Sequence, residues 1–256
     1  MTPKNRTRLY RCLTGALLLW AMIPALATLI GNLPLAVALA LLSTVLAFRY
    51  WKKHLRHWLI AHKFAAVVPG RLYRSGQISR HHLPRILRRH RIGTVIDLTP
   101  APAHPNPHQR AERDAIAALG IQGLRFPMRG DGSGELLAVA DAVTALHRAL
   151  AGGGAVLVHC AAGVQRTGHV LSAYLLLVAG AEPAAVYQYA ERFGWEPSRS
   201  RAWPEQLNRR MELLAEILVD RGVIAAVPRP LPAFPLEKPR DLAPWWAGSR
   251  ALLRMG

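Results

Sequence analysis

The sequence has little cysteine and, over a long initial stretch, no acidic residue. Cys12 and Cys160 are the only cysteines in 256 residues, and they lie in unlike surroundings, so we expect no structural disulfide. No Asp or Glu precedes Asp97, whereas nine Lys and Arg occur through Lys63 and seven more from Arg71 to Arg91. This imbalance, with a net charge of +18, favours an anionic partner, either membrane lipid or nucleic acid.

Two long runs near the N-terminus lack charge altogether, 13–30 and 33–48. As helices they would rise roughly 24–27 Å, close to the ~30 Å hydrocarbon core of a bilayer. A buried soluble hairpin is the alternative, but helices that are apolar all round leave no face for water. We therefore expect two transmembrane helices.

Basic residues flank the pair of runs on the outside and are missing from the turn between them. The positive-inside rule then places both ends in the cytoplasm, with the rest of the chain on the cytoplasmic side of an inner or plasma membrane. A competing interpretation is a signal peptide cut after Ala25-Leu-Ala27, which would leave the second run as an anchor and the remaining chain outside.

Residues 49–63 mix aromatic and basic side chains, which is typical of a segment lying on anionic headgroups. Nucleic acid is the second candidate for this stretch. Because Trp51 and Trp58 stand beside an expected span, membrane anchoring explains them more simply and nucleic acid is not expected. The expected organisation is a membrane hairpin with its basic interfacial segment at 1–63, a folded domain at 64–220 and a proline-rich tail at 221–256.

The folded domain alternates strand and helix patterns, which predicts an α/β fold with a central sheet flanked by helices. From Gly222 onward the proline-rich composition predicts a loosely ordered arm that returns to the membrane surface, or simple disorder. The expected strands lie within 67–77 (two short ones), at 92–98, 121–126 and 155–158, and the expected helices at 79–91 (capped by Ser79), 108–119, 135–150, directly after the loop at 159–168, 182–193 and 204–220.

The stretch 156–168, Val-Leu-Val-His-Cys-Ala-Ala-Gly-Val-Gln-Arg-Thr-Gly, predicts a strand, a tight loop and a helix start. Backbone N–H groups in such a loop, with the partial positive charge of a helix N-terminus, form a cradle for an anion. The same cradle favours a thiolate at Cys160, which suits a reducing compartment. Arg166 can bind two phosphate oxygens at once. This pattern predicts attack of Cys160 on phosphorus.

These residues resemble the His-Cys-x5-Arg-Ser/Thr loop of the cysteine-dependent phosphatases, most closely the compact dual-specificity and tyrosine phosphatase branch. The stretch from Arg74 to Gln77, Arg-Ser-Gly-Gln, is similar to the opening of the same branch. The resemblance covers roughly residues 67–220. It implies a dual-specificity-phosphatase-like sheet and no metal or cofactor. A rhodanese-like sulfur carrier also places a cysteine in an anion loop, but Arg166-Thr-Gly leading into a helix favours a phosphatase.

The resemblance also implies roles for individual residues. Cys160 would be the nucleophile, and Arg166 would clamp the phosphate. His159 would orient the loop, and the Thr167 hydroxyl would aid departure of the thiolate. The expected phosphate-binding residues are Ala161, Ala162, Gly163, Val164, Gln165 and Arg166.

The general acid in this family is an aspartate on a loop about 30 residues before the cysteine, and Asp131 precedes Cys160 by 29. Glycines on both sides of Asp131 predict a mobile loop, where an acid can reach a leaving group. An ordinary turn aspartate is the plainer alternative. Glu135 is a second candidate acid, and Asp97 is expected to be structural at a strand end.

The expected function is that of a membrane-anchored phosphomonoesterase acting on protein phosphotyrosine, with phosphoserine and phosphothreonine left open. One alternative is a lipid phosphatase acting on a headgroup such as phosphatidylglycerophosphate. Another is an inactive phospho-binding module. Because Val164-Gln165 puts no lysine or histidine in the loop, heavily phosphorylated inositol headgroups are less favoured. The expected partners are a phosphorylated protein or phospholipid and an anionic membrane surface.

Overall fold

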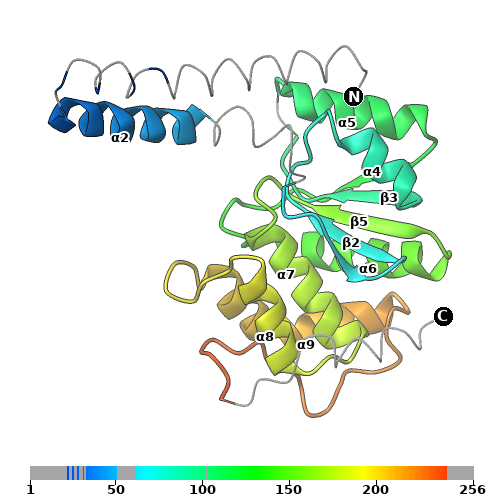
Figure 1. Cartoon of the computed structure of the whole chain (residues 1–256). Coiled ribbons are helices and arrows are strands. Elements are labelled where there is room, and N and C mark those ends of the chain that lie inside the picture. The colour runs from blue at the N-terminus through cyan, green and yellow to red at the C-terminus, as the bar shows by residue number, and fades with distance from the viewer. Residues whose placement is uncertain are drawn as a thin grey trace. The chain divides into compact units, whose positions relative to one another are not determined.

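The computed structural model describes residues 33–50, 62–101 and 103–240, together with Met22, Ala25, Thr28 and Gly31. The chain divides into two units, residues 1–60 and 61–256, which are described separately. Figure 1 shows their elements.

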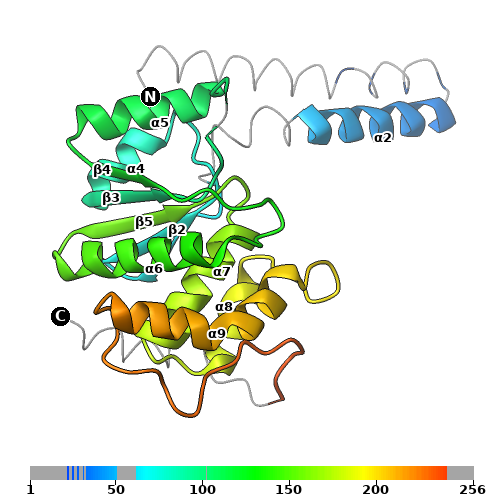
Figure 2. The same cartoon turned by 180° about the vertical axis from the view of Figure 1, so that it is seen from behind.

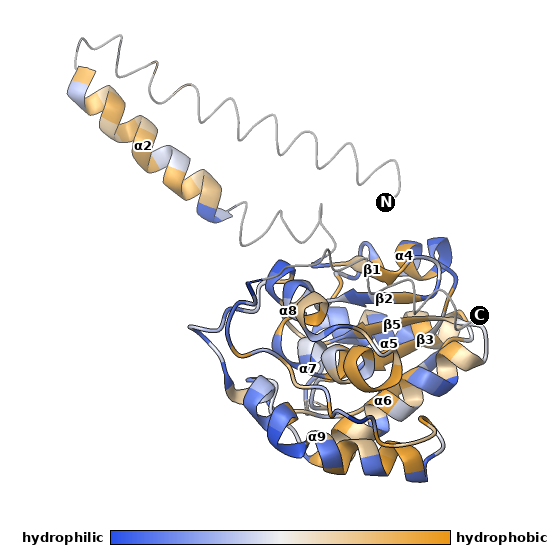
Figure 3. Cartoon of the chain, turned by 90° about the horizontal axis from the view of Figure 1, so that it is seen from below, coloured by the Kyte–Doolittle hydropathy of each residue, from blue (hydrophilic) through white to orange (hydrophobic). Residues whose placement is uncertain are grey.

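In the first unit, helix α2 (Leu33–Tyr50) is long and apolar enough to cross a membrane, and it is the only such helix among the described residues. Its leucines and valines are largely exposed and only Ala36 is buried, so apolar colour covers most of the helix in Figure 3. The expected span at 33–48 thus corresponds to one helix that continues to Tyr50. Apart from Met22, Ala25 and Thr28, the expected span at 13–30 lies outside the described residues, so the described residues hold one of the two expected spans.

The second unit is built on a five-stranded mixed sheet of order β1-β2-β5-β3-β4. β1 pairs antiparallel with β2, and the other neighbours are parallel. The strands are β1 (Ala65–Val68), β2 (Leu72–Ser75), β3 (Ile92–Asp97), β4 (Gln122–Arg125) and β5 (Ala155–His159). β2, β3, β4 and β5 lie close to where the sequence predicts them, because short β-branched and apolar runs bounded by turns favour buried strands. β1 begins at Ala65, two residues before the expected range.

Helices cover both faces of this sheet (Figures 1 and 2). On one face lie α4 (Leu83–Arg89) and α5 (Pro107–Ala118). On the other lie α6 (Leu136–Ala151) and α7 (Gln165–Ala173), with α8 (Pro183–Arg192) and α9 (Ala202–Asp220) packed outside them.

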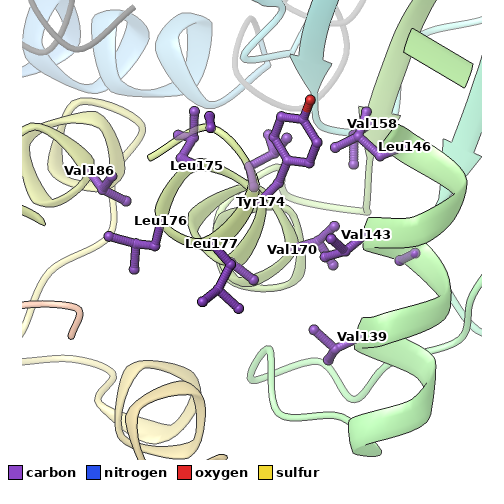
Figure 4. Packing of buried hydrophobic residues seen from close by; sticks show 14 of the residues in the cluster. Val139, Val143, Leu146, Val158, Val170, Tyr174, Leu175, Leu176, Leu177 and Val186 are labelled. Carbon is purple, nitrogen blue, oxygen red and sulfur yellow. The ribbon is translucent and has the colours of Figure 1, made fainter. Parts of the chain in front are cut away.

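The central strand β5 contributes to both cores because its side chains alternate between the faces. Ala155 and Leu157 join the apolar cluster beneath α4 and α5, whereas Val156 and Val158 join the larger cluster beneath α6 and α7. Figure 4 shows Val158 near side chains of α6 and α7. α7 continues as a π-helical turn, Tyr174–Val178, which is buried except at its end. With apolar contacts on both sides, the end of β5 is held in the middle of the domain.

The helix predicted from Ser79 begins later than expected. α4 starts at Leu83, and its N-cap residue His82 makes no side-chain capping bond. Pro84 explains the difference, because proline lacks an N–H and is tolerated only in the first helical turn. Ser79 instead lies in a turn, and its carbonyl oxygen accepts hydrogen bonds from the amides of His82 and Leu83.

The first half of the expected loose arm is packed against the domain. Phe234 is 1% exposed and lies in a ring cluster with Tyr187, Trp195 and Trp203. Asn208 on α9 binds both the amide and the carbonyl of Phe234 at 2.8 Å. Burial of a large aromatic ring therefore overrides the proline-rich composition up to this point. Residues 241–256 lie outside the described residues.

Candidate active site

The loop that follows β5 leads directly into a helix, as the sequence predicts. β5 ends at His159 between β2 and β3, and α7 begins at Gln165. Cys160 is 1% exposed, and its Sγ accepts a hydrogen bond from the amide of Gly163 at 3.2 Å. The thiol thus lies inside a turn of backbone amides at the N-terminus of a helix.

Several groups around Cys160 favour its thiolate form. Burial acts in the opposite direction, but the hydroxyl and amide of Thr167, the charge of Arg166 and the amide of Gly163 together lower the pKa of Cys160 below its ordinary value. A lowered pKa increases the fraction of the nucleophilic thiolate.

Arg166 carries a polar atom that is free to bind a ligand. Its Nε atom is buried and has no hydrogen-bond partner among the described residues, and one terminal nitrogen lies 3.5 Å from the carbonyl oxygen of Leu98. Since buried donors are normally satisfied, the Nε atom of Arg166 indicates a site built for an anion.

The loop is supported from β2 by the Arg-Ser-Gly-Gln segment. Arg74 is fully buried and donates to the carbonyl oxygen of Gly163 and, at 2.7 Å, to the hydroxyl of Tyr189. Its guanidinium lies 3.9 Å from the ring centroid of Phe193. The amide of Gln77 donates to the carbonyl of Ala161 at 2.9 Å. The Arg-Ser-Gly-Gln segment, 74–77, therefore supports the backbone of the loop that carries Cys160.

Gly163 is required by both conformation and space. Its φ is +64°, and a Cβ at this position would lie 2.5 Å from the amide nitrogen of Gly76. The loop backbone and β2 approach so closely that no side chain fits between them.

His159 is completely buried and belongs to a charged network. Its Nε2 lies 3.1 Å from Glu112 and 4.0 Å from Asp97. Burial lowers its pKa, but the charge and hydrogen bond of Glu112, with a smaller effect of Asp97, raise the pKa of His159 to about 9. The two carboxylates therefore favour the protonated form of His159.

The network is closed by Arg125 and Gln77. Arg125 binds Asp97 at 2.9 Å, and the side-chain amide of Gln77 donates to Glu112 at 2.9 Å. Asp97 also accepts hydrogen bonds from the amide and hydroxyl of Thr99. Asp97, Glu112 and His159 offer ligand atoms within 4.8 Å of one another, and both carboxylates are already engaged by Arg125 and Gln77.

Asp131 lies on the exposed loop between β4 and α6. Its carboxylate accepts hydrogen bonds from the hydroxyl and amide of Ser133 at 2.7 and 2.9 Å. The Ser133 hydroxyl is the main reason why the pKa of Asp131 is lowered. No hydrogen bond or ion pair of the described residues joins Asp131 to Cys160 or Arg166.

The backbone of this loop is nevertheless fixed beside the catalytic loop. A Cβ on Gly132 would lie 2.9 Å from Gln165, the first residue of α7. The carbonyl of Gly132 accepts from His169 at 2.8 Å, and the amide of Gly134 donates to Gln206 at 2.9 Å. Gln165 itself accepts from the indole of Trp203 at 2.9 Å.

Glu135, the second candidate acid, is the N-cap residue of α6 and makes no capping bond with its side chain. Sequence analysis missed Glu112, His169 and Arg74 as supporting residues. Only Arg74 had a signal, since it begins the Arg-Ser-Gly-Gln segment.

Residues 72–181 match the family model described as "Polymorphic toxin system, DSP-PTPase phosphatase". This segment is therefore similar to phosphatases of the DSP-PTPase type. The match runs from β2 past the catalytic loop and includes Asp131, Cys160 and Arg166. No curated protein gives a significant match to the chain.

Two solved structures with TM-scores above 0.5 have the same fold. The core catalytic domain of the PP-IP phosphatase SIW14 from S. cerevisiae is 18% identical, with a TM-score of 0.52 over 64% of this chain and 96% of that one. A second structure of the Siw14 catalytic core is 17% identical, with a TM-score of 0.51 over 65% and 96%. TpbA from P. aeruginosa is 23% identical over 53% and 83%, with a TM-score of 0.42. The DSP-like α/β sheet flanked by helices agrees with the expected fold class.

Proposed function

We propose that this chain is a membrane-anchored phosphomonoesterase that removes phosphate from phosphotyrosine in proteins through a phosphocysteine intermediate. The observation that carries the proposal is the setting of Cys160. Its buried thiol accepts a hydrogen bond from the Gly163 amide, has a lowered pKa and is followed by an arginine with an unpartnered Nε.

In the first step the Cys160 thiolate attacks phosphorus, so that an S–P bond forms as the ester P–O bond breaks. The leaving phenol oxygen takes a proton from Asp131. The amides of residues 161–166 and the guanidinium of Arg166 stabilise the charge on the phosphoryl oxygens. Because this charge is greatest in the transition state, these groups accelerate the chemical step as well as binding the substrate.

In the second step water attacks the phosphocysteine and the S–P bond breaks. Asp131, now ionised, takes the proton from the water, and inorganic phosphate leaves. The Thr167 hydroxyl donates to the departing sulfur, which stabilises the thiolate as it re-forms. No metal or cofactor takes part in either step.

A lipid phosphatase is the second candidate, and helix α2 favours it. α2 is long and apolar enough to cross a membrane, and its apolar side chains are exposed. A catalytic domain tethered in this way would be held near phospholipid headgroups such as that of phosphatidylglycerophosphate. Under either proposal α2 is a membrane anchor, with the catalytic domain in the cytoplasm and the basic segment 49–63 at an anionic surface.

Two further outcomes belong in the test. The SIW14 structure is described as that of a PP-IP phosphatase, but this chain has no lysine or histidine between Cys160 and Arg166. An inactive phospho-binding module would retain the anion loop without turnover, although it would have no use for a thiol with a lowered pKa.

The experiment is phosphate release by the full-length protein in detergent micelles. A phosphotyrosine peptide, phosphatidylglycerophosphate and a PP-IP compound are compared, with Cys160→Ser as the blank. We expect Cys160-dependent release from the peptide at the highest kcat/KM. A higher kcat/KM for phosphatidylglycerophosphate would favour the lipid phosphatase over the protein phosphatase. Phosphate binding with no release from any compound would support the binding module.

A further inference from the structure

Glu112 lies inside the domain, on the α5 face of the sheet, where a carboxylate needs a strong reason to be. The residue is 5% exposed, and isolated buried carboxylates are costly unless they are paired and hydrogen-bonded. Both of its oxygens are engaged, Oε1 with His159 at 3.1 Å and Oε2 with the side-chain amide of Gln77 at 2.9 Å.

Each partner of Glu112 is one step from the catalytic loop. His159 precedes Cys160 directly, and its carbonyl oxygen accepts from the amide of Leu98 at 2.9 Å. Gln77 donates its own amide to the carbonyl of Ala161. One carboxylate on α5 thus connects the residue before the nucleophile with the segment that supports the loop after it.

We infer that Glu112 is a positioning residue for the nucleophile, which holds His159 as a buried cation against Cys160 and so favours the thiolate. This inference rests on the proposed function, for which it names a further residue. Glu112 touches neither substrate nor phosphate. It acts on the reaction through His159.

The charges around His159 support this assignment. Three charged or titratable groups face His159 directly: Glu112 on α5, Asp97 on β3 and Cys160 in the loop. Two cations lie one neighbour further away, Arg125 on β4 beside Asp97 and Arg166 on α7 beside Cys160. Asp97 is already neutralised by Arg125 at 2.9 Å and lies 4.0 Å from His159, farther than Glu112 at 3.1 Å. Glu112 is therefore the group that offsets the burial of the imidazolium.

The sign of the effect follows from the same arrangement. Without the charge of Glu112, burial dominates and the pKa of His159 falls, so that the ring becomes neutral. Cys160 then loses a neighbouring positive charge, and its pKa rises. If Glu112 acted only as a structural brace, removing its charge while keeping its shape would leave the thiolate unaffected.

The test measures the rate at which iodoacetamide alkylates Cys160 in the full-length protein as a function of pH. Glu112→Gln keeps the shape of the side chain and removes its charge, and its single carbonyl oxygen can still accept a hydrogen bond from His159 or Gln77. We expect its pH profile to shift upward, with roughly tenfold slower alkylation on the acidic side of the wild-type midpoint. Glu112→Asp, which keeps the charge, restores part of the rate.

Asp114→Asn is the matched control, since Asp114 lies two residues away on α5 with its side chain 73% exposed; its profile should coincide with wild type. A Glu112→Gln profile that also coincides with wild type would overturn the inference. If Glu112→Gln does not fold, NMR of the wild-type His159 ring decides: an imidazolium at neutral pH is expected, and a neutral ring contradicts the assignment. Alkylation needs no turnover, so a wild-type protein without phosphatase activity would remove the proposed function and leave this measurement intact.

Discussion

The imidazole of His169 on α7 donates a hydrogen bond from Nδ1 to the carbonyl oxygen of Gly132 at 2.8 Å. Burial lowers the pKa of His169 to about 4, so the ring is neutral in ordinary buffers. Because α7 directly follows the loop that carries Cys160, and Gly132 follows Asp131, this bond connects the loop of the proposed nucleophile with the backbone of the proposed general acid.

Replacing His169 should therefore affect catalysis more than folding. We expect His169→Leu to lower kcat roughly 10-fold or more, because small misplacement of a catalytic group is costly. His169→Asn, whose side-chain amide can replace Nδ1, should recover part of the loss. The loss should be greatest for substrates with poor leaving groups, which depend most on protonation by Asp131. An equal loss for good and poor leaving groups would show that His169 does not act on the acid.

Ser133 should set the pH range of the acid. Its hydroxyl and amide stabilise ionised Asp131 and lower the pKa of that carboxyl, whereas donation to the leaving group requires the protonated form. Ser133→Ala removes the hydroxyl, so the pKa of Asp131 rises and the alkaline limb of the kcat/KM profile moves to higher pH. If the alkaline limb keeps its position in Ser133→Ala but disappears in Asp131→Asn, then Asp131 is the acid but the hydrogen bond from the Ser133 hydroxyl is absent during turnover. A limb unaffected by both changes would remove Asp131 from the mechanism.

Alanine substitutions at Gly163 and Gly153 distinguish two costs of a side chain, backbone strain at positive φ and steric collision of the Cβ with neighbouring atoms. Both have positive φ, +64° and +81°, but a Cβ on Gly153 meets nothing within 4 Å, whereas one on Gly163 meets the backbone of β2. Gly153→Ala should cost only about 1 kcal/mol of stability. Gly163→Ala should cost about 3 kcal/mol, since a collision adds to the strain, and should abolish activity. Thermal unfolding in detergent and phosphate release measure both. Equal thermal shifts would argue against the close approach of the loop and β2.

Arg74 should resist conservative replacement. Its planar guanidinium binds two oxygens and stacks on Phe193, which a lysine cannot reproduce. We expect both Arg74→Lys and Arg74→Met to destabilise the domain by about 2–4 kcal/mol and to raise KM for phosphate esters. Tyr189→Phe, which removes only one of the partners, serves as the milder comparison. A lysine variant that matches wild type in melting temperature and KM would show that charge alone suffices.

Local patterns in the sequence predicted the parts of the site that are continuous in the chain. One continuous segment contains strand 155–158, the loop from His159 to Thr167 and the helix after it. The apolar pattern, the glycine in the loop and the His-Cys-x5-Arg-Thr motif are therefore enough to identify it. Asp131 was placed on a loop by its flanking glycines, and the contact of Gly132 with Gln165 brings that loop beside α7.

The features that sequence analysis missed depend on packing between distant segments. Glu112 lies in a polar helix stretch and looks like a solvated charge, and only the contact of α5 with β5 buries it. Phe234 stands among prolines, and its burial requires the aromatic pocket formed by α8 and α9. Pro84 in the sequence already indicates the late start of α4, because proline is tolerated only in the first turn of a helix. Residues 51–61 and most of 13–30 lie outside the described residues, so the two-span anchor remains unsupported beyond α2.

The central claim is that Cys160 carries the phosphoryl group during turnover. The most direct measurement mixes the full-length protein with a radiolabelled phosphotyrosine peptide, quenches in acid within milliseconds and maps the label by mass spectrometry. The account predicts label on Cys160 in the wild type, more of it in Asp131→Asn when the leaving group is good, because hydrolysis is slowed, and none in Cys160→Ser. Phosphate release without label on Cys160, or release that persists in Cys160→Ser, would contradict it.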